Sequence, residues 1–172
     1  AWRTRPAAAP GAGSPARRAV AFEPDTCDAA LARRRGLTVD ERFFGANSAK
    51  GGAAADLAYA RHVIEHVFDF RDFFSGLALA TSADADLVLE TPELDHHCLT
   101  ASLNPFHVEH VHVFSRRSLA RLAASHGWRL AGQVTTEDGN LIAWFRRQPG
   151  EAGQLAGLPD GPRLDGLQSR FE

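Results

Sequence analysis

Residues 55–69 constrain the fold of this chain more than any other segment. Residues 57–60 are apolar or aromatic and follow a pair of glycines, which is typical of a short buried strand after a turn. Apolar residues then recur at helical steps of four and three, at Val63, Val67, Phe70, Phe74 and Leu77. Open α/β sheets bind ligands at the carboxyl ends of their strands. Polar residues stand at that point here, namely Arg61, His62, Glu65 and His66.

Strands and helices alternate along the rest of the chain, which predicts a mostly parallel sheet with helices on both faces. A turn at 138–140 predicts a hairpin that adds an antiparallel last strand. We expect a loop at 94–105, and Asp25 or Thr26 is expected to cap the first helix. The predicted strands are 19–23, 37–39, 57–60, 86–90, 128–134 and 141–145. The predicted helices are 27–35, 63–80 and a third that begins after Ser115 and ends at Gly127.

Proline and glycine mark the two ends of the chain. Residues 1–17 contain three prolines and no apolar period, so we expect a flexible or degenerate arm. Residues 148–172 are rich in glycine, proline and polar residues and predict a flexible tail. Between them, residues 18–147 predict a single α/β domain.

Composition excludes several classes of protein. A net charge of −2 gives no general attraction to nucleic acid or to a membrane surface. The chain has no run of 18 apolar residues and no secretory signal at its start. Its two isolated cysteines, Cys27 and Cys98, are typical of free thiols in a cytoplasmic protein. We therefore expect a cytoplasmic protein with no nucleic-acid or membrane partner.

Several segments together resemble one known family. Residues 56–67 are similar to the segment after the fourth strand of class I S-adenosylmethionine (SAM) methyltransferases. Residues 21–25 resemble the second-strand motif of that family, and residues 87–94 resemble its fifth-strand segment. The resemblance spans residues 18–146 in the right order. A further series has the spacing of the family, at Glu109-His110, Phe114-Ser115, Ser118-Leu119 and Gly127-Trp128.

This resemblance implies a Rossmann-like α/β sheet whose last strand is antiparallel. It also implies an enzyme that moves the methyl group of SAM to a carbon or oxygen atom of a small-molecule acceptor. The motifs look closest to those of sugar C-methyltransferases. A decayed homologue that acts only as a binding or interaction module is the alternative.

The resemblance also implies the residues that bind the cofactor. Glu23 occupies the end of the second strand of the family, where a carboxylate accepts both ribose hydroxyls, and Pro24 belongs to the same motif. Phe43 and Phe44 are near the expected adenine position, although both can equally be core residues. Arg61 and His62 complete the expected cofactor-binding set.

Four further residues are expected to serve catalysis. His110 is the predicted base, Glu109 is predicted to orient it, and His66 is predicted to help hold the acceptor. His107 stands where the related enzymes carry tyrosine. The alternative is a polar loop without a base, because many methyltransferases work by positioning alone. No metal ligand is expected, and we expect Glu23, the Arg61/His62 bend and Glu109-His110 to meet in one crevice.

Residues 62–66 also fit a second pattern, the H-x-x-E-H signature of some zinc peptidases. On a helix, His62 and His66 would share a face and bind zinc, with Glu65 as the base. This gives zinc hydrolysis as a distant alternative, because no third ligand is evident in the sequence.

The first strand of the family fold and its glycine-rich loop are the parts that this sequence lacks. Residues 11–14 (Gly-Ala-Gly-Ser) can be a remnant of that loop, but no apolar strand precedes them. We therefore expect an incomplete sheet. Its exposed strand edges would favour self-association or completion by another chain.

Overall fold

The computed structural model describes residues 19–52, 54–103 and 105–148. They fall into two compact units that divide between Phe43 and Phe44. The predicted arm, the glycine-rich remnant at 11–14 and nearly all of the predicted tail lie outside the described residues. A single domain over residues 18–147 stays a prediction.

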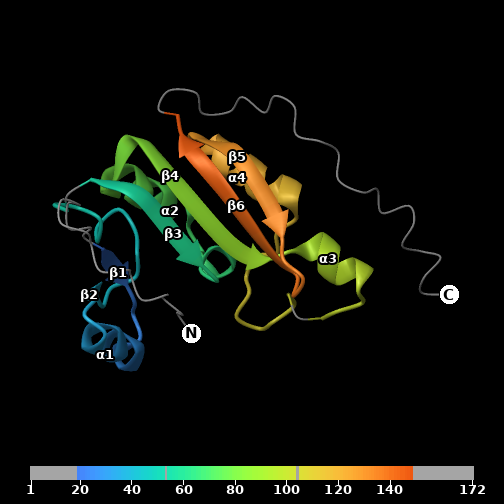
Figure 1. The fold of residues 1–172 in the computed structure, drawn as a ribbon, viewed down its shortest axis with the longest axis horizontal. Helices are drawn as coiled ribbons and strands as arrows, with labels where there is room; N and C mark the ends of the chain where they lie inside the picture. Colours follow the sequence, from blue (N-terminus) through green and yellow to red (C-terminus); the bar gives the residue numbers. More distant parts are fainter. Residues whose placement is uncertain (1–18, 53, 104, 149–172) are drawn as a thin grey trace, which may run out of the picture. The chain divides into compact units, whose positions relative to one another are not determined.

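The first unit is a small strand–helix–strand motif (Figure 1). β1 (Val20–Phe22) and β2 (Thr38–Asp40) pair in parallel, and α1 (Thr26–Arg34) connects them. The Asp25 side chain accepts hydrogen bonds from the backbone N–H groups of Cys27 and Asp28, which confirms the predicted cap. Gly36 has a φ of +84°, the left-handed conformation that ends many helices.

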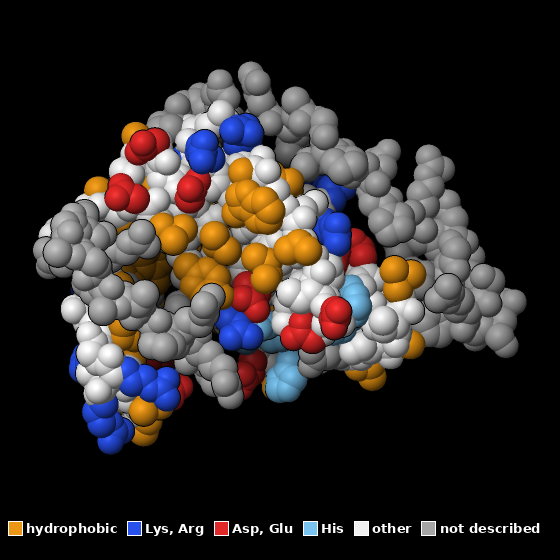
Figure 2. Space-filling view, viewed as in Figure 1, with side chains coloured by type: hydrophobic (Ala, Val, Ile, Leu, Met, Phe, Trp, Pro, Cys, Tyr) orange, Lys and Arg blue, Asp and Glu red, His pale blue; other side chains and the backbone are white. Residues whose placement is uncertain are grey.

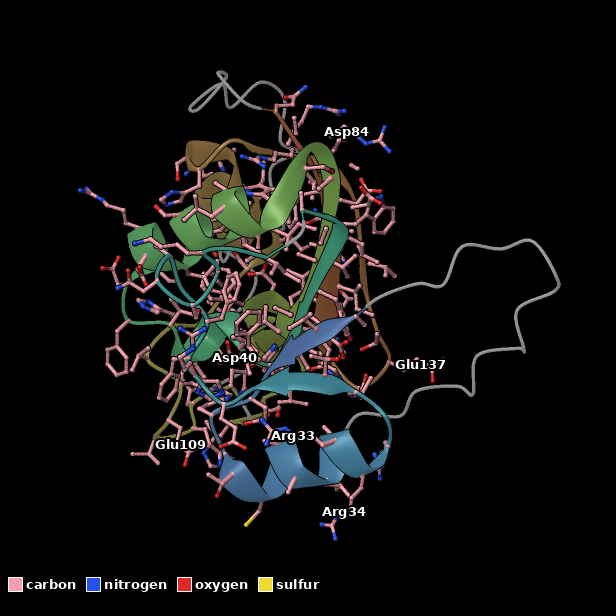
Figure 3. The ribbon with its side chains drawn as sticks, turned by 90° about the vertical axis from the view of Figure 1, so that its left-hand side faces the viewer. Arg33, Arg34, Asp40, Asp84, Glu109 and Glu137 are labelled. Atoms are coloured by element: carbon pink, nitrogen blue, oxygen red, sulfur yellow. The ribbon has the colours of Figure 1, made fainter. Side chains whose placement is uncertain are left out.

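Packing in this unit depends on a few side chains. Ala29 and Val39 are the buried apolar residues among those described in it. Arg33 points from α1 toward β2 (Figure 3), donates to the Val39 carbonyl at 2.8 Å and forms an ion pair with Glu41. Arg34 points away from the strands. So little buried apolar area contributes only weakly to stability.

The second unit contains a four-stranded sheet with the order β3-β4-β6-β5 (Figure 1). β3 (Ala55–Arg61) runs parallel to β4 (Thr81–Pro92). β6 (Asn140–Arg147) lies between β4 and β5 (Trp128–Thr135) and is antiparallel to both. The predicted antiparallel last strand is thereby confirmed. No strand among the described residues joins this sheet to the β1–β2 pair.

The core of the second unit lies on one face of this sheet. α2 (Phe70–Ala80) and α4 (Arg116–Ser125) both pack on that face, behind the strands in Figure 1. Alternation along each strand turns one set of side chains to the helices and the next set away. The sequence predicted helices on both faces, whereas α2 and α4 share one. The largest fully buried apolar residues include Ile64, Leu87, Leu89, Leu119, Trp128, Leu141 and Phe145.

The opposite face carries apolar side chains that remain exposed, and Figure 2 shows them gathered over the strands. Leu57 is 58% exposed, Tyr59 is 39% exposed and Trp144 is 42% exposed. The Trp144 ring lies against Gly132, where an added Cβ would come within 2.1 Å of it. All-parallel sheets usually have both faces covered, whereas sheets with antiparallel strands, such as β6 and β5 here, often leave one face exposed.

Three local predictions require correction. The single helix predicted over 63–80 is broken into the 3₁₀ turn η1 (Ile64–His66) and α2. The break arises because the Asp69 side chain accepts from the Asp72 N–H and caps a new helix, while Val67 is extended. The predicted loop at 94–105 contains α3 (Leu94–Leu99), and β4 begins at Thr81 rather than at residue 86.

The partly buried His126 and the buried His97 make stability depend on pH. The His126 ring stacks on Phe74 with 4.4 Å between centroids, and burial, with a smaller effect of Arg71, lowers its pKa. Burial, followed by the charge of His96, also lowers the pKa of His97. An unfolded histidine has a pKa of about 6.5, so below that pH the unfolded chain binds more protons than the folded one.

We therefore expect the free energy of unfolding to fall as pH is lowered from 7 to 5. The His126→Phe variant keeps a ring against Phe74 but loses the titrating group. Urea denaturation at several pH values should give a shallower pH dependence for this variant than for the parent. An identical pH dependence in the two proteins would contradict the assignment to His126.

None of the helices in the described ranges has both the length and the apolar character that crossing a membrane requires.

Candidate functional site

The candidate site is built where β3 and β4 end. Arg61 is the last residue of β3, and His62 turns the chain away with a φ of +50°. Such a φ is uncommon outside glycine and is often found at functional sites. The His62 N–H still donates to the Glu90 carbonyl of β4 at 2.8 Å, which holds the turn on the sheet. Histidine side chains gather near this end of the sheet (Figure 2).

η1 fixes the next residues against the core. Ile64 is fully buried and anchors the turn, and Glu65 is only 1% exposed. The backbone N–H of His112 donates to the Glu65 carbonyl at 3.1 Å. This bond ties the segment that contains His107 and His110 to η1, so residues distant in sequence share one site.

His66 and His110 meet at this point. Their ring centroids are 4.9 Å apart, with 70° between the ring planes. His66 Nδ1–H donates to the Glu109 carbonyl at 2.8 Å, and His110 Nδ1–H donates to the Pro105 carbonyl at 2.9 Å. A carbonyl oxygen only accepts, so each Nδ1 carries a hydrogen, and in the neutral form of each ring Nε2 carries the lone pair. The two half-buried rings thus offer two basic nitrogen atoms.

The Glu109 carboxylate does not hydrogen-bond to His110 in this structure, and its predicted orienting role stays a prediction. The Glu109 side chain is exposed, and it lies at the opposite end of the second unit from Asp84 in Figure 3. The backbone carbonyl of Glu109 accepts from His66, whereas Pro105 supplies the acceptor that orients His110. His107 is also exposed, with its ring centroid 5.8 Å from that of His110.

Arg61 belongs to a polar network that sequence reasoning missed. Arg61 Nε donates to Glu90 Oε1 at 2.9 Å, and the Tyr59 hydroxyl donates to Glu90 Oε2 at 2.7 Å. Burial, together with the Glu90 carboxylate, raises the pKa of Tyr59 to about 12.

A hydrogen bond from Thr136, with a smaller effect of Arg61, lowers the pKa of Asp138. The network depends on the strand register that pairs Arg61 with Glu90, which the sequence does not show.

A third buried acid, after Glu65 and Glu90, lies just beyond β4. Glu93 is 3% exposed and accepts from Arg116 Nε at 2.8 Å and from the Thr135 hydroxyl. The pair joins the end of β4 to the start of α4. Nothing in the sequence pattern predicts it, because the partners come from three separate elements.

The remaining predicted cofactor residues belong mainly to the first unit. Glu23 follows β1, and its Oε1 accepts from the Asp25 N–H at 3.0 Å. Phe43 is 82% exposed. Phe44 belongs to the second unit and packs edge-on against Phe73 at 5.6 Å, which favours the core alternative for this residue. The predicted convergence of Glu23 with Arg61 and His110 in one crevice stays a prediction.

Several solved structures share this fold. An O-methyltransferase family protein from Burkholderia thailandensis matches with 19% identity and a TM-score of 0.54, over 76% of this chain and 43% of that one. The 1,6-didemethyltoxoflavin-N1-methyltransferase of the same organism, with 1,6-didemethyltoxoflavin and S-adenosylhomocysteine bound, matches with 14% identity and a TM-score of 0.56. That match covers 76% of this chain and 61% of the enzyme.

A third structure is a complex of the Haloferax volcanii Trm112 methyltransferase activator with a putative methyltransferase, matched with 10% identity and a TM-score of 0.58. The match covers 76% of this chain and 72% of the matched chain. This chain thus spans 43% and 61% of the lengths of the two Burkholderia proteins. Comparison with curated protein sequences gives no match.

The sequence itself identifies the family. Residues 9–132, most of the chain, match the family described as methyltransferase domain. The structural matches agree with this family, and nothing in either comparison supports a zinc hydrolase. The family that the sequence motifs predicted is confirmed, and the chain belongs to the methyltransferase domain family.

Proposed function

We propose that this chain is a SAM-dependent methyltransferase that methylates a carbon or oxygen atom of a small molecule. One observation carries this proposal beyond family membership. His66 and His110 come together at the carboxyl end of parallel strands, each with its Nδ1–H held by a backbone carbonyl. A pair of oriented imidazoles at a strand end suits an acceptor that must lose a proton.

The proposed chemistry is a direct displacement. The acceptor loses a proton, its carbon or oxygen atom attacks the methyl group of SAM, and S-adenosylhomocysteine leaves. Histidine is the side chain that ordinarily titrates near neutral pH, so His110 Nε2 is proposed to receive the proton. His66 is proposed to hold the acceptor, with His107 and Glu109 at the outer edge of the site. The resemblance to sugar C-methyltransferases makes a sugar the proposed acceptor class.

The cofactor roles rest on the motifs and on one similar structure. The toxoflavin methyltransferase binds S-adenosylhomocysteine, the product that SAM leaves after transfer. Glu23 is proposed to accept the ribose hydroxyls, with Pro24 fixing the chain beside it. Phe43 is proposed to lie against adenine, and Phe44 stays the second candidate for that role. Arg61 and His62 are proposed to line the cofactor site at the end of β3.

Calorimetric titration with SAM and with S-adenosylhomocysteine tests this proposal directly. The parent protein should bind both. The Glu23→Gln variant should bind both about 10- to 100-fold more weakly, because a hydrogen bond to a charged group contributes about 1.5–3 kcal/mol.

The matched control is Glu137→Gln, which makes the same change at an exposed turn residue (Figure 3) and should bind like the parent. If the parent bound neither SAM nor S-adenosylhomocysteine, the proposed methyltransferase activity would be refuted. That result would favour the alternative of a binding or interaction module. Equal affinities for the parent and Glu23→Gln would refute the role of Glu23.

A further inference from the structure

We propose that Glu65, His66 and His110 form a binding site for one divalent transition-metal ion. One potential ligand atom from each of the three residues lies within 4.8 Å of the other two. The set combines two imidazoles and one carboxylate. This inference goes beyond the proposed methyl transfer, and metal binding can be measured without SAM or acceptor.

The carboxylate of Glu65 gives the first independent reason. Its Oε1 accepts from His62 Nδ1 at 3.0 Å, whereas its Oε2 is buried without a hydrogen-bond partner among the described residues. The residue is 1% exposed, so bulk water does not compensate the oxygen atom. A buried polar atom without a partner destabilises the folded chain, and a charged one does so more strongly. A cation beside Oε2 would remove that cost.

The carbonyl partners of the two histidines give the second reason. Metal-binding histidines usually donate the other ring N–H to a carboxylate or a backbone carbonyl, which fixes the tautomer and the ring. His66 donates from Nδ1 to the Glu109 carbonyl, and His110 donates from Nδ1 to the Pro105 carbonyl. Both rings therefore have the tautomer that leaves Nε2 for an ion.

The ligand set also indicates the kind of ion. Imidazole with carboxylate suits zinc, iron, cobalt or manganese better than magnesium, which prefers oxygen atoms and water. A bound ion would lie about 2.1 Å from each ligand and would draw the ligand atoms to about 3–3.5 Å apart. The side chains would move inward while η1 stays held by Ile64 and by the His112 N–H bond.

This site differs from a zinc-peptidase site built on His62, Glu65 and His66. In this structure, His62 donates to Glu65 and so supports a ligand instead of serving as one. His110, from another segment, completes the set. The three protein ligands leave at least one coordination position open, as in catalytic metal sites.

An ion here would change the role of His110. The lone pair of Nε2 cannot bind a metal and receive a proton at once. In the metal-loaded protein, the ion would instead bind an acceptor oxygen through its open position and lower the pKa of that group. This last step, unlike metal binding itself, rests on the proposed methyltransferase function and favours an oxygen over a carbon acceptor.

The test is a titration of the purified chain with Co²⁺, followed by visible absorption, and a calorimetric titration with Zn²⁺. We expect one ion per chain and new absorption bands typical of Co²⁺ bound to nitrogen and oxygen atoms. Glu65→Gln, His66→Ala and His110→Ala should each weaken binding about 100-fold, since even supporting residues of metal sites change affinity 10- to 100-fold. His66 and His110 are half-buried, so replacing either one leaves the buried Glu65 in place. These two variants therefore test metal binding without a change in the buried core.

The matched control is His96→Ala, which removes a histidine on α3 that is outside the cluster and should leave affinity unchanged. No binding at all would overturn the proposal. So would binding that all three cluster variants retain, which would indicate adventitious exposed histidines. Because SAM is absent from these titrations, their failure would leave the SAM-binding result standing, and the reverse also holds.

Discussion

Replacing Phe145 with alanine is expected to lower the free energy of unfolding by about 3–5 kcal/mol. Phe145 is fully buried on β6, where it pairs in register with Leu87 of β4 and Leu130 of β5. It therefore contributes to the layer that binds the sheet to α2 and α4. Domains of this size have a total stability of about 5–15 kcal/mol, so the loss is a large fraction of it. Urea denaturation at 25 °C measures it.

Phe68→Ala is the matched control, because it removes the same side chain in the same unit from a position that is 85% exposed. This control should change the free energy of unfolding by less than about 0.5 kcal/mol. Equal losses in the two variants would mean that the alternation assigned to β6 is wrong.

Replacing Arg116 with methionine is expected to cost about 3 kcal/mol of unfolding free energy. The change keeps the length of the side chain but removes the cation that donates to the buried Glu93 carboxylate. Breaking a buried pair costs about 3–5 kcal/mol, because one charge stays buried without its partner. The low end applies because the Arg116 side chain is 46% exposed and Thr135 still donates to Glu93.

A double-mutant cycle separates this effect from lost packing. Glu93→Gln removes the charge, so the double variant should be more stable than the sum of the two single losses predicts. Arg121→Met, at an exposed position of the same helix, should change stability by less than about 0.5 kcal/mol. A coupling energy near zero would show that Arg116 and Glu93 do not act as a pair.

The periodicity of apolar residues predicts most helices and strands of this fold. It predicts poorly the residues at which they begin and end. The alternation along β6 and the helical spacing in α4 fix those elements from sequence alone. The stripe that runs through Val63, Val67 and Phe70 continues across the break before α2, because the cap at Asp69 falls on the polar side of the stripe. The sequence predicts a loop over α3, because two histidines and an aspartate leave too few apolar residues to show the period of so short a helix.

The site was predictable only in part for a similar reason. The sequence predicts the location of the candidate site at the end of β3, because ligands bind at the carboxyl ends of parallel strands. The pairing of His66 with His110 came from the family resemblance, because no spacing rule connects residues so far apart. The burial of Glu65 and the partners of Glu90 depend on strand register and on packing. Those are properties of the folded chain that local sequence does not encode.

The small first unit has a consequence for how a nucleoside would be held. Its described residues bury only Ala29 and Val39 as apolar core, so transient local opening of β1, α1 and β2 should require little free energy. Glu23 belongs to this easily opened part of the chain. Any ligand that engages Glu23 must first select the closed form, and its apparent affinity is reduced by the fraction of time that the motif spends open.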